Sequence, residues 1–309
     1  MFIVICSHTL CNAMIIVLFG FTKRSKRMRE IFITLWEDTG SRPDSVRIHK
    51  MESIATTQKL YCFVLYPIIA ATFISSLVKF YLSIYNECIE IWDDMNVHVA
   101  YAILITITVY AVSITVISTI YFMLICDLTT ERLNEIARDI EKMSSVEEVI
   151  KRLEEVMRRH QKICDLIWSM DEFFSVYIFI NYLVCIPESC LLLYQFFIVK
   201  NLKEIIGLWA FGDIMNLTII SLYAASVTIS VHDSSDVVHK LLRFELPRRH
   251  QMQVTLFLEK LNGPNIGLTC LDFFVVTKGV ILKVFSAILT YFLLFLQFRQ
   301  PESEKKSES

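Results

Sequence analysis

Apolar residues gather into six runs of about 20 residues each, separated by polar segments. Twenty residues is the length that an α-helix needs to cross a hydrocarbon core of about 30 Å at 1.5 Å per residue. The pattern therefore predicts an all-α, polytopic membrane protein with six spans. The predicted spans are Phe2–Phe21, Cys62–Leu82, Val99–Ile125, Phe173–Val199, Ile205–Val231 and Gly279–Phe298.

Basic residues are distributed unevenly between the connections. Three connections carry nine, eight and six Lys or Arg residues: 22–61, 126–171 and 232–278. The other three carry none, two and three: 83–97, 200–204 and 299–309. Because Lys and Arg are enriched in cytoplasmic loops, we expect the first set in the cytoplasm and the C-terminal tail 299–309 outside.

The first run follows Met1 directly, without a basic residue before it, and a basic stretch from Lys23 to Arg29 comes after it. A cleaved signal peptide carries its charge on the other side, so we expect a retained helix. A Met placed directly before an apolar run is also what a chain lacking an earlier helix would show.

The connection from Asp127 to Met170 is amphipathic. Its apolar residues recur at three- and four-residue spacing among charges, which is the helical pattern: Leu133, Ile136, Ile140, Val149, Leu153, Val156 and Ile163. Ser145 and Glu148 form a capping box that predicts the start of a helix. We expect helices that prolong the membrane helices into the cytoplasm; the apolar stripe packs within its own hairpin or contacts another subunit. Without repeats or Pro- or Gly-rich linkers, residues 1–298 form one predicted domain.

Composition and motifs exclude several classes of function. The net charge of −2 gives no sign of a nucleic-acid partner. The nine cysteines lie mostly inside apolar runs without a CxxC pair, which is typical of small buried hydrophobic residues. The seven histidines are scattered, and HExxH, GxSxG and P-loop motifs are absent from the sequence. We therefore expect that the protein is not an enzyme and has no cofactor or metal site. Membrane lipids are expected to surround its spans.

The last run has one face that differs from the rest. At 100° per residue, a stripe about 100° wide collects its polar and small residues: Lys283, Ser286, Ala287, Thr290, Leu294 and Gln297. Exposing such a face to lipid is costly, so it must meet protein or water. It is either a close helix–helix contact, which the residues alone favour, or the wall of a pore with Leu294 as a hydrophobic constriction and Gln297 facing ions.

A motif in this run carries a resemblance. Thr290 and Tyr291, five apolar residues, then Gln297 and Phe298 form TYhhhhhQF, which resembles the C-terminal signature of the arthropod gustatory receptor family within the insect chemoreceptor superfamily. The preceding segment is similar as well, through Gly267, Leu268, Thr269, Phe273, Phe274 and Thr277. The motif match covers about the last 35 residues, and the other spans agree in number, orientation and loop length.

The resemblance implies a fold and an assembly. Family members have seven membrane helices, a cytoplasmic N-terminus and an extracellular C-terminus, so this chain resembles one without its first helix. They are tetrameric ligand-gated cation channels in the plasma membrane, either homomeric or with other receptor subunits. Their last helix lines the pore, and their cytoplasmic helices make most of the subunit contact. The last apolar segment is split in the family, and Lys278 with Gly279 is the expected break here.

The resemblance also implies roles for residues at motif positions. Gln297 and Phe298 would lie at the filter, Leu294 would be the gate, and Thr290 and Tyr291 would position the pore helix. Lys283 departs from this picture, because four ammonium groups in a pore would oppose the entry of cations.

The resemblance further implies a ligand pocket within each subunit, in the outer half of the membrane. Glu188 and Asp213 lie at similar depth in sequential spans, where carboxylates are costly in lipid and should face the interior. Further candidates are Asn181, Asn216, Tyr110 and Trp209. Alternatively, Glu188 is protonated and Asp213 is held by Asn216 as structural glue.

The function predicted from these residues and the resemblance is a gustatory-type receptor that is a channel subunit gated by a small-molecule tastant. The alternatives are a non-channel receptor or transporter, or a light- or peroxide-sensing relative within the same superfamily.

Overall fold

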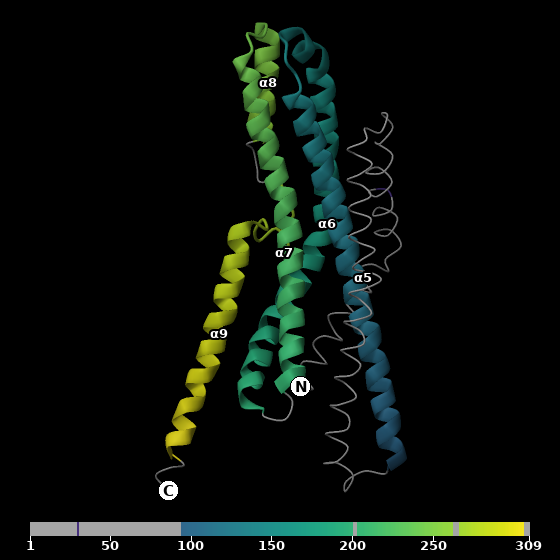
Figure 1. The fold of residues 1–309 in the computed structure, drawn as a ribbon, viewed down its shortest axis with the longest axis vertical. Helices are drawn as coiled ribbons and strands as arrows, with labels where there is room; N and C mark the ends of the chain where they lie inside the picture. Colours follow the sequence, from purple (N-terminus) through teal and green to yellow (C-terminus); the bar gives the residue numbers. More distant parts are fainter. Residues whose placement is uncertain (1–29, 31–93, 200–202, 262–265, 306–309) are drawn as a thin grey trace.

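The computed structural model describes residue 30 and residues 94–199, 203–261 and 266–305. This part of the chain is almost entirely helical, and its only β-type pairing is an isolated bridge between Thr269 and Val275. The elements, labelled in Figure 1, are α5 (Asp94–Glu141), α6 (Val146–Ile198), α7 (Lys203–His239), η2 (Lys240–Arg243), α8 (Arg248–Leu261) and α9 (Lys278–Lys305). The predicted spans Phe2–Phe21 and Cys62–Leu82 lie outside the described residues.

Four of the described helices are long and apolar enough to cross a membrane. They are Val112–Glu141, Val146–Ile198, Lys203–Arg243 and Lys278–Phe298. Each of the four predicted spans in this part of the chain falls on one of the helices α5, α6, α7 and α9. The expectation of an all-α, polytopic membrane protein is therefore confirmed.

Helices α5 and α6 run far beyond the apolar spans. Helix α5 continues from Ile125 to Glu141, and α6 begins at Val146, well before Phe173. At 1.5 Å per residue these extensions are about 24 and 40 Å long. The predicted amphipathic helices are thus continuous with the membrane helices, because neither extension contains a Gly or Pro that would end the helix.

The extensions of α5 and α6 pack on each other within the chain. All seven residues of the predicted apolar stripe are buried there: Leu133, Ile136, Ile140, Val149, Leu153, Val156 and Ile163. Burial of each such side chain contributes about 1.5–3 kcal/mol. The stripe is therefore buried within its own chain, so these seven side chains are not available for contact with another subunit.

The turn between α5 and α6 has the predicted cap. The hydroxyl of Ser145 accepts a hydrogen bond from the backbone N–H of Glu148 at 3.3 Å. The carboxylate of Glu148 reaches back to the N–H of Ser144, at 3.4 Å, instead of to Ser145. One ion pair joins the two helices of the hairpin, Arg159 with Asp139 at 2.7 Å. Another joins Lys240 of η2 to Glu141 of α5 at 2.7 Å.

Helix α8 returns along α7, and α9 lies at the other end of α7 (Figure 1). Val254, Phe257 and Leu258 are buried on one face of α8. Helix α9 begins at Lys278, the position at which the family resemblance implies a break. Helices α8 and α9 thus lie at the two ends of α7.

Candidate functional site

One face of α9 packs against its own subunit. Ile288 is 4% exposed, and Val280 and Val284 are partly buried beside the core. Two aromatic pairs join α9 to α6: Phe295 with Tyr194, whose ring centroids are 5.8 Å apart, and Phe292 with Phe197 at 5.4 Å. The packing face of α9 is thus centred on Ile288.

The stripe of polar and small residues lies on the opposite face. Measured from Ile288 at 100° per residue, it spans about 160° to 260° around the helix. Its members Lys283, Thr290, Leu294 and Gln297 are all exposed. In the most apolar 18-residue stretch of α9, 6% of the residues are buried, against 44% to 56% in the other three membrane-length helices. Water, lipid or another chain must therefore cover this face.

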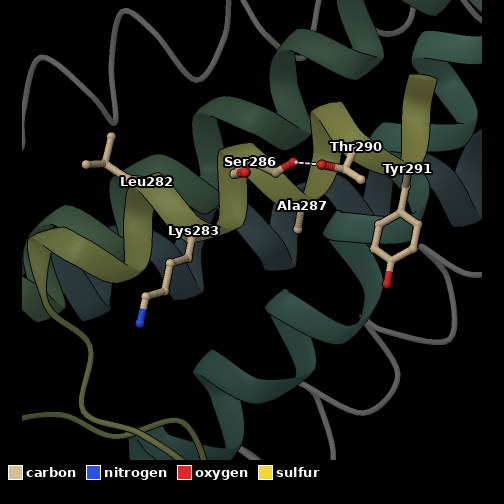
Figure 2. Close-up of a pocket in the computed structure, with 6 residues that line it drawn as sticks. All are labelled: Leu282, Lys283, Ser286, Ala287, Thr290 and Tyr291. Carbon is tan, nitrogen blue, oxygen red and sulfur yellow. Dashed lines mark hydrogen bonds between the residues drawn. The ribbon is translucent and has the colours of Figure 1, made fainter. Parts of the chain in front are cut away.

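The same face carries a shallow hollow of about 480 Å³. It is lined by residues of α9 alone: Leu282, Lys283, Ser286, Ala287, Thr290 and Tyr291. Figure 2 shows the side chains of Lys283, Ala287 and Tyr291 projecting on one side of α9. The hydroxyl of Thr290 donates to the backbone carbonyl of Ser286 at 2.7 Å, as the dashed line in Figure 2 marks. This bond turns the polar atom of Thr290 toward its own helix and leaves its methyl group outward.

A polar network connects α5, α6 and α7 in their buried interior. The amide of Asn216 donates to the side-chain oxygen of Asn181 at 3.1 Å, and the amide of Asn181 donates to the Tyr177 carbonyl at 2.8 Å. The hydroxyl of Thr119 lies 3.0 Å from both the Asn216 side-chain oxygen and the Tyr177 hydroxyl. Because Thr119 has one hydroxyl proton, Tyr177 donates to Thr119 when Thr119 donates to Asn216. Two predicted site residues, Asn181 and Asn216, are thus brought together.

Three further predicted residues lie along the same helix faces as the network: Glu188, Trp209 and Asp213. The network and these three residues are together called the polar seam. Glu188 lies seven residues after Asn181 on α6, and Trp209 lies seven residues before Asn216 on α7. A step of seven residues returns to the same helix face two turns away, about 10.5 Å along the axis. Because α6 and α7 are antiparallel, both residues are displaced in the same direction from the network. Glu188 is 3% exposed and Trp209 is 8% exposed.

Asn216 does not hold Asp213, contrary to the alternative drawn from the sequence. Asn216 hydrogen-bonds to Asn181 and Thr119. One carboxylate oxygen of Asp213 is buried without a hydrogen-bond partner in the part of the chain that the structure describes. Tyr110, in contrast, is 61% exposed on α5 and does not reach the seam formed by the described helices.

Two residues of the network were missed by sequence reasoning. Thr119 and Tyr177 lie in apolar runs where Thr and Tyr are common, and neither carries a charge. The spacing of Tyr177 and Asn181 by one helical turn is the only sequence signal for a shared polar face.

Family and sequence comparisons point to one group of receptors. The family described as 7tm Chemosensory receptor matches residues 1–302. Two Caenorhabditis elegans proteins are similar in sequence. "High-energy light unresponsive protein 1" is 25% identical over 160 residues, which cover 49% of this chain and 36% of that protein. "Gustatory receptor family protein 3" is 25% identical over 182 residues, covering 56% and 40%. The matched segments span well under half of either relative.

The fold is similar to that of an insect olfactory receptor, OR5 from Machilis hrabei. The TM-score is 0.77 at 14% identity, covering 96% of this chain and 80% of the receptor. The structure of the same receptor in complex with eugenol gives 0.74 at 16% identity, covering 95% and 80%. The resemblance carried by TYhhhhhQF is thereby confirmed, and the chain belongs to the 7tm chemosensory receptor family.

Proposed function

We propose that the chain is a subunit of a gustatory-type, ligand-gated cation channel of the plasma membrane. Four subunits, identical or mixed with related ones, place their α9 helices around a shared pore. Residues 1–298 form the receptor domain, and the polar tail 299–309 is extracellular. The observation that carries the proposal is the polar stripe of α9, which lies opposite the face that packs on α6 and is exposed on the single subunit.

Positions on the stripe and at its edge have separate roles in this proposal. Leu294 forms the hydrophobic gate, and Gln297 with Phe298 forms the filter at the outer end. Thr290 and Tyr291 position the helix one turn before the gate. Lys283 lies 14 residues from Gln297, about 21 Å along the helix, so its charge is well separated from the filter.

The ligand in this proposal is a small molecule that binds at the outward part of the polar seam. Glu188, Trp209 and Asp213 line its site, and Asn181 with Asn216 closes the inner end. The buried carboxylate oxygen of Asp213 without a partner supports a polar ligand contact at this depth. The fold relative solved with eugenol is a precedent for a small-molecule ligand in that receptor.

Thiol modification of α9 tests the pore directly. In full-length receptors expressed in cells, Thr290→Cys and Gln297→Cys are exposed to a positively charged methanethiosulfonate while currents are evoked with a panel of small molecules. We expect modification to reduce the current at both positions. Phe292→Cys, on the packing face, is the matched control and should stay insensitive, as should the unsubstituted receptor. Equal effects at Phe292 and Gln297, or none at the stripe, would remove the pore assignment.

A second candidate function is a light-responsive receptor, favoured by the similarity to "High-energy light unresponsive protein 1". The same recordings under short-wavelength illumination or with added peroxide distinguish it. A current evoked by light or peroxide and by none of the small molecules would favour this second function.

A further inference from the structure

Residues 266–277, which directly precede α9, form a hairpin, here called the α9 hairpin (Ile266–Thr277). The N–H of Cys270 donates to the Phe274 carbonyl at 2.9 Å, and the N–H of Val276 donates to the Leu268 carbonyl at 2.9 Å. Leu268 and Val276 are fully buried. The first arm of the α9 hairpin is largely buried, and the second arm is fixed by these hydrogen bonds and by Val276, while Phe273 and Phe274 remain exposed.

A side chain of α6 holds this hairpin at two points. One carboxylate oxygen of Asp171 accepts the backbone N–H of Thr269 at 2.5 Å, and the other accepts the Thr269 hydroxyl at 2.9 Å. The Thr269 hydroxyl in turn accepts the N–H of Asp272 at 3.2 Å. Hydrogen bonds to an ionised carboxylate are stronger than neutral ones, so this bidentate pair fixes the hairpin to α6 in one orientation.

The α9 hairpin also contacts α7. A Cβ atom at Gly267 would overlap the Thr228 hydroxyl and lie 3.0 Å from Val275 Cγ1, so the backbone approaches α7 as closely as glycine permits. The Thr228 hydroxyl donates to the Val276 carbonyl at 3.3 Å. The hairpin is therefore held between α6 and α7.

Two aromatic contacts extend the attachment along α6 toward the polar seam. Phe273 lies beside Phe179, with ring centroids 6.2 Å apart, and Phe274 is stacked on Tyr182 at 6.2 Å and 16°. Tyr182 directly follows Asn181 of the network. Asp171, Phe179 and Tyr182 all belong to the continuous helix α6. A displacement of α6 at the seam therefore moves the residues that hold the hairpin.

Helix α9 starts directly after the hairpin and is otherwise lightly packed. The N–H of Val280, in its first turn, donates to the Thr277 carbonyl at 3.0 Å. Since few of its own residues are buried, the direction of α9 depends strongly on the hairpin at its base. The hairpin is thus placed to pass a movement of α6 to α9.

We propose that Asp171 and Thr269 are positioning residues that couple α6 to α9 and set the balance between closed and open arrangements. This inference rests on the proposed channel function. A contact changes such a balance only if it is stronger in one arrangement than in the other. The bidentate geometry makes the Asp171–Thr269 contact sensitive to small displacements, because both hydrogen bonds need the same alignment.

Single-channel recording tests the coupling without a ligand. Full-length receptors are purified, placed in planar bilayers in symmetrical KCl, and compared as unsubstituted protein, Asp171→Asn, Thr269→Val and the double variant. We expect the open probability to change by about tenfold or more in each single variant, in the same direction, and the double variant to match them. Thr269→Ser should restore the unsubstituted behaviour. Unchanged or additive open probabilities would overturn the proposal.

A control and a second readout separate this inference from the channel proposal. Asp165→Asn makes the same change of charge on α6 at a residue that hydrogen-bonds to Gln161, and it should leave the open probability unchanged. Spin labels at the exposed positions 168 on α6 and 282 on α9 report their distance, with labelled subunits diluted by unlabelled ones. If the unsubstituted protein stays silent both without ligand and with the panel of small molecules, the channel function is contradicted. In that case the spin labels decide on the coupling. A broader distribution of the distance between positions 168 and 282 in Asp171→Asn and Thr269→Val would support it, and an unchanged distribution would overturn it.

Discussion

Adding a methyl group at Gly267 should loosen the α9 hairpin by an amount that the structure bounds. The new Cβ would overlap the Thr228 hydroxyl and lie 3.0 Å from Val275 Cγ1 and 3.1 Å from Thr228 Cβ. The hydroxyl could rotate away only by losing its bond to the Val276 carbonyl. Overpacking of this kind costs about 1–3 kcal/mol. A local destabilisation of about 1–3 kcal/mol corresponds to about 5- to 150-fold in the opening equilibrium.

The thiol of Cys270 reports that opening. Cys270 lies inside the hairpin and is 3% exposed, so its alkylation requires the hairpin to open. N-ethylmaleimide labelling of the purified receptor, followed by mass spectrometry of the peptide that contains Cys270, gives the rate. Gly267→Ala should label about 5- to 150-fold faster than the unsubstituted protein. In a Thr228→Ala background the same substitution should have a smaller effect, because the hydroxyl that it overlaps is gone.

A glycine on α7 provides the control. A Cβ at Gly212 would meet no atom within 4 Å, so Gly212→Ala should leave the labelling rate of Cys270 unchanged. If Gly267→Ala labels no faster than the unsubstituted protein, or if its effect is the same with and without Thr228, the close approach of the hairpin to α7 does not stabilise it.

Three further predictions concern other parts of the chain. Burial raises the pKa of the Cys270 thiol to about 11. Its labelling rate in the native receptor should therefore increase about tenfold per pH unit between pH 7 and pH 10, because the thiolate is the reactive form. A plateau of the rate near pH 9 would indicate a thiol with an ordinary pKa. Asn181→Leu leaves the amide of Asn216 without its acceptor and should lower the free energy of unfolding by about 1–3 kcal/mol, measured by thermal unfolding in detergent; an unchanged midpoint would show that the network does not stabilise the fold. If Lys283 faces the proposed pore, Lys283→Gln should increase the inward cation conductance, because it removes a positive charge there. A conductance equal to that of the unsubstituted protein would place Lys283 outside the pore.

The described spans and the apolar stripe of the α5 and α6 extensions could be predicted because each depends on periodicity along one segment. The spacing of Leu133, Ile136 and Ile140 predicts a buried helix face, whichever helix packs against it. The break before α9 was predictable through Gly279 and the family resemblance. The continuity of α5 and α6 with their extensions could be predicted as well, because no Gly or Pro interrupts the sequence where each membrane span meets its extension.

Contacts between distant segments were beyond sequence reasoning. Asp171 and Thr269 are 98 residues apart, and nothing in the pattern around either residue indicates the other. The left-handed φ angles of Leu271 and Asp272, 46° and 58°, occur without the Asn-Gly or Gly that usually marks such a turn. The polar network behaves similarly, because Thr119 and Tyr177 become informative only when α5 and α6 are seen side by side.

The central claim is that four copies of α9 turn their polar faces toward a common axis. An experimental structure of the full-length receptor in lipid nanodiscs tests it most directly. We expect a fourfold assembly in which Thr290, Leu294 and Gln297 face a continuous water path while Ile288 remains packed on α6. A single subunit, or an assembly in which these three side chains face lipid, would contradict the account.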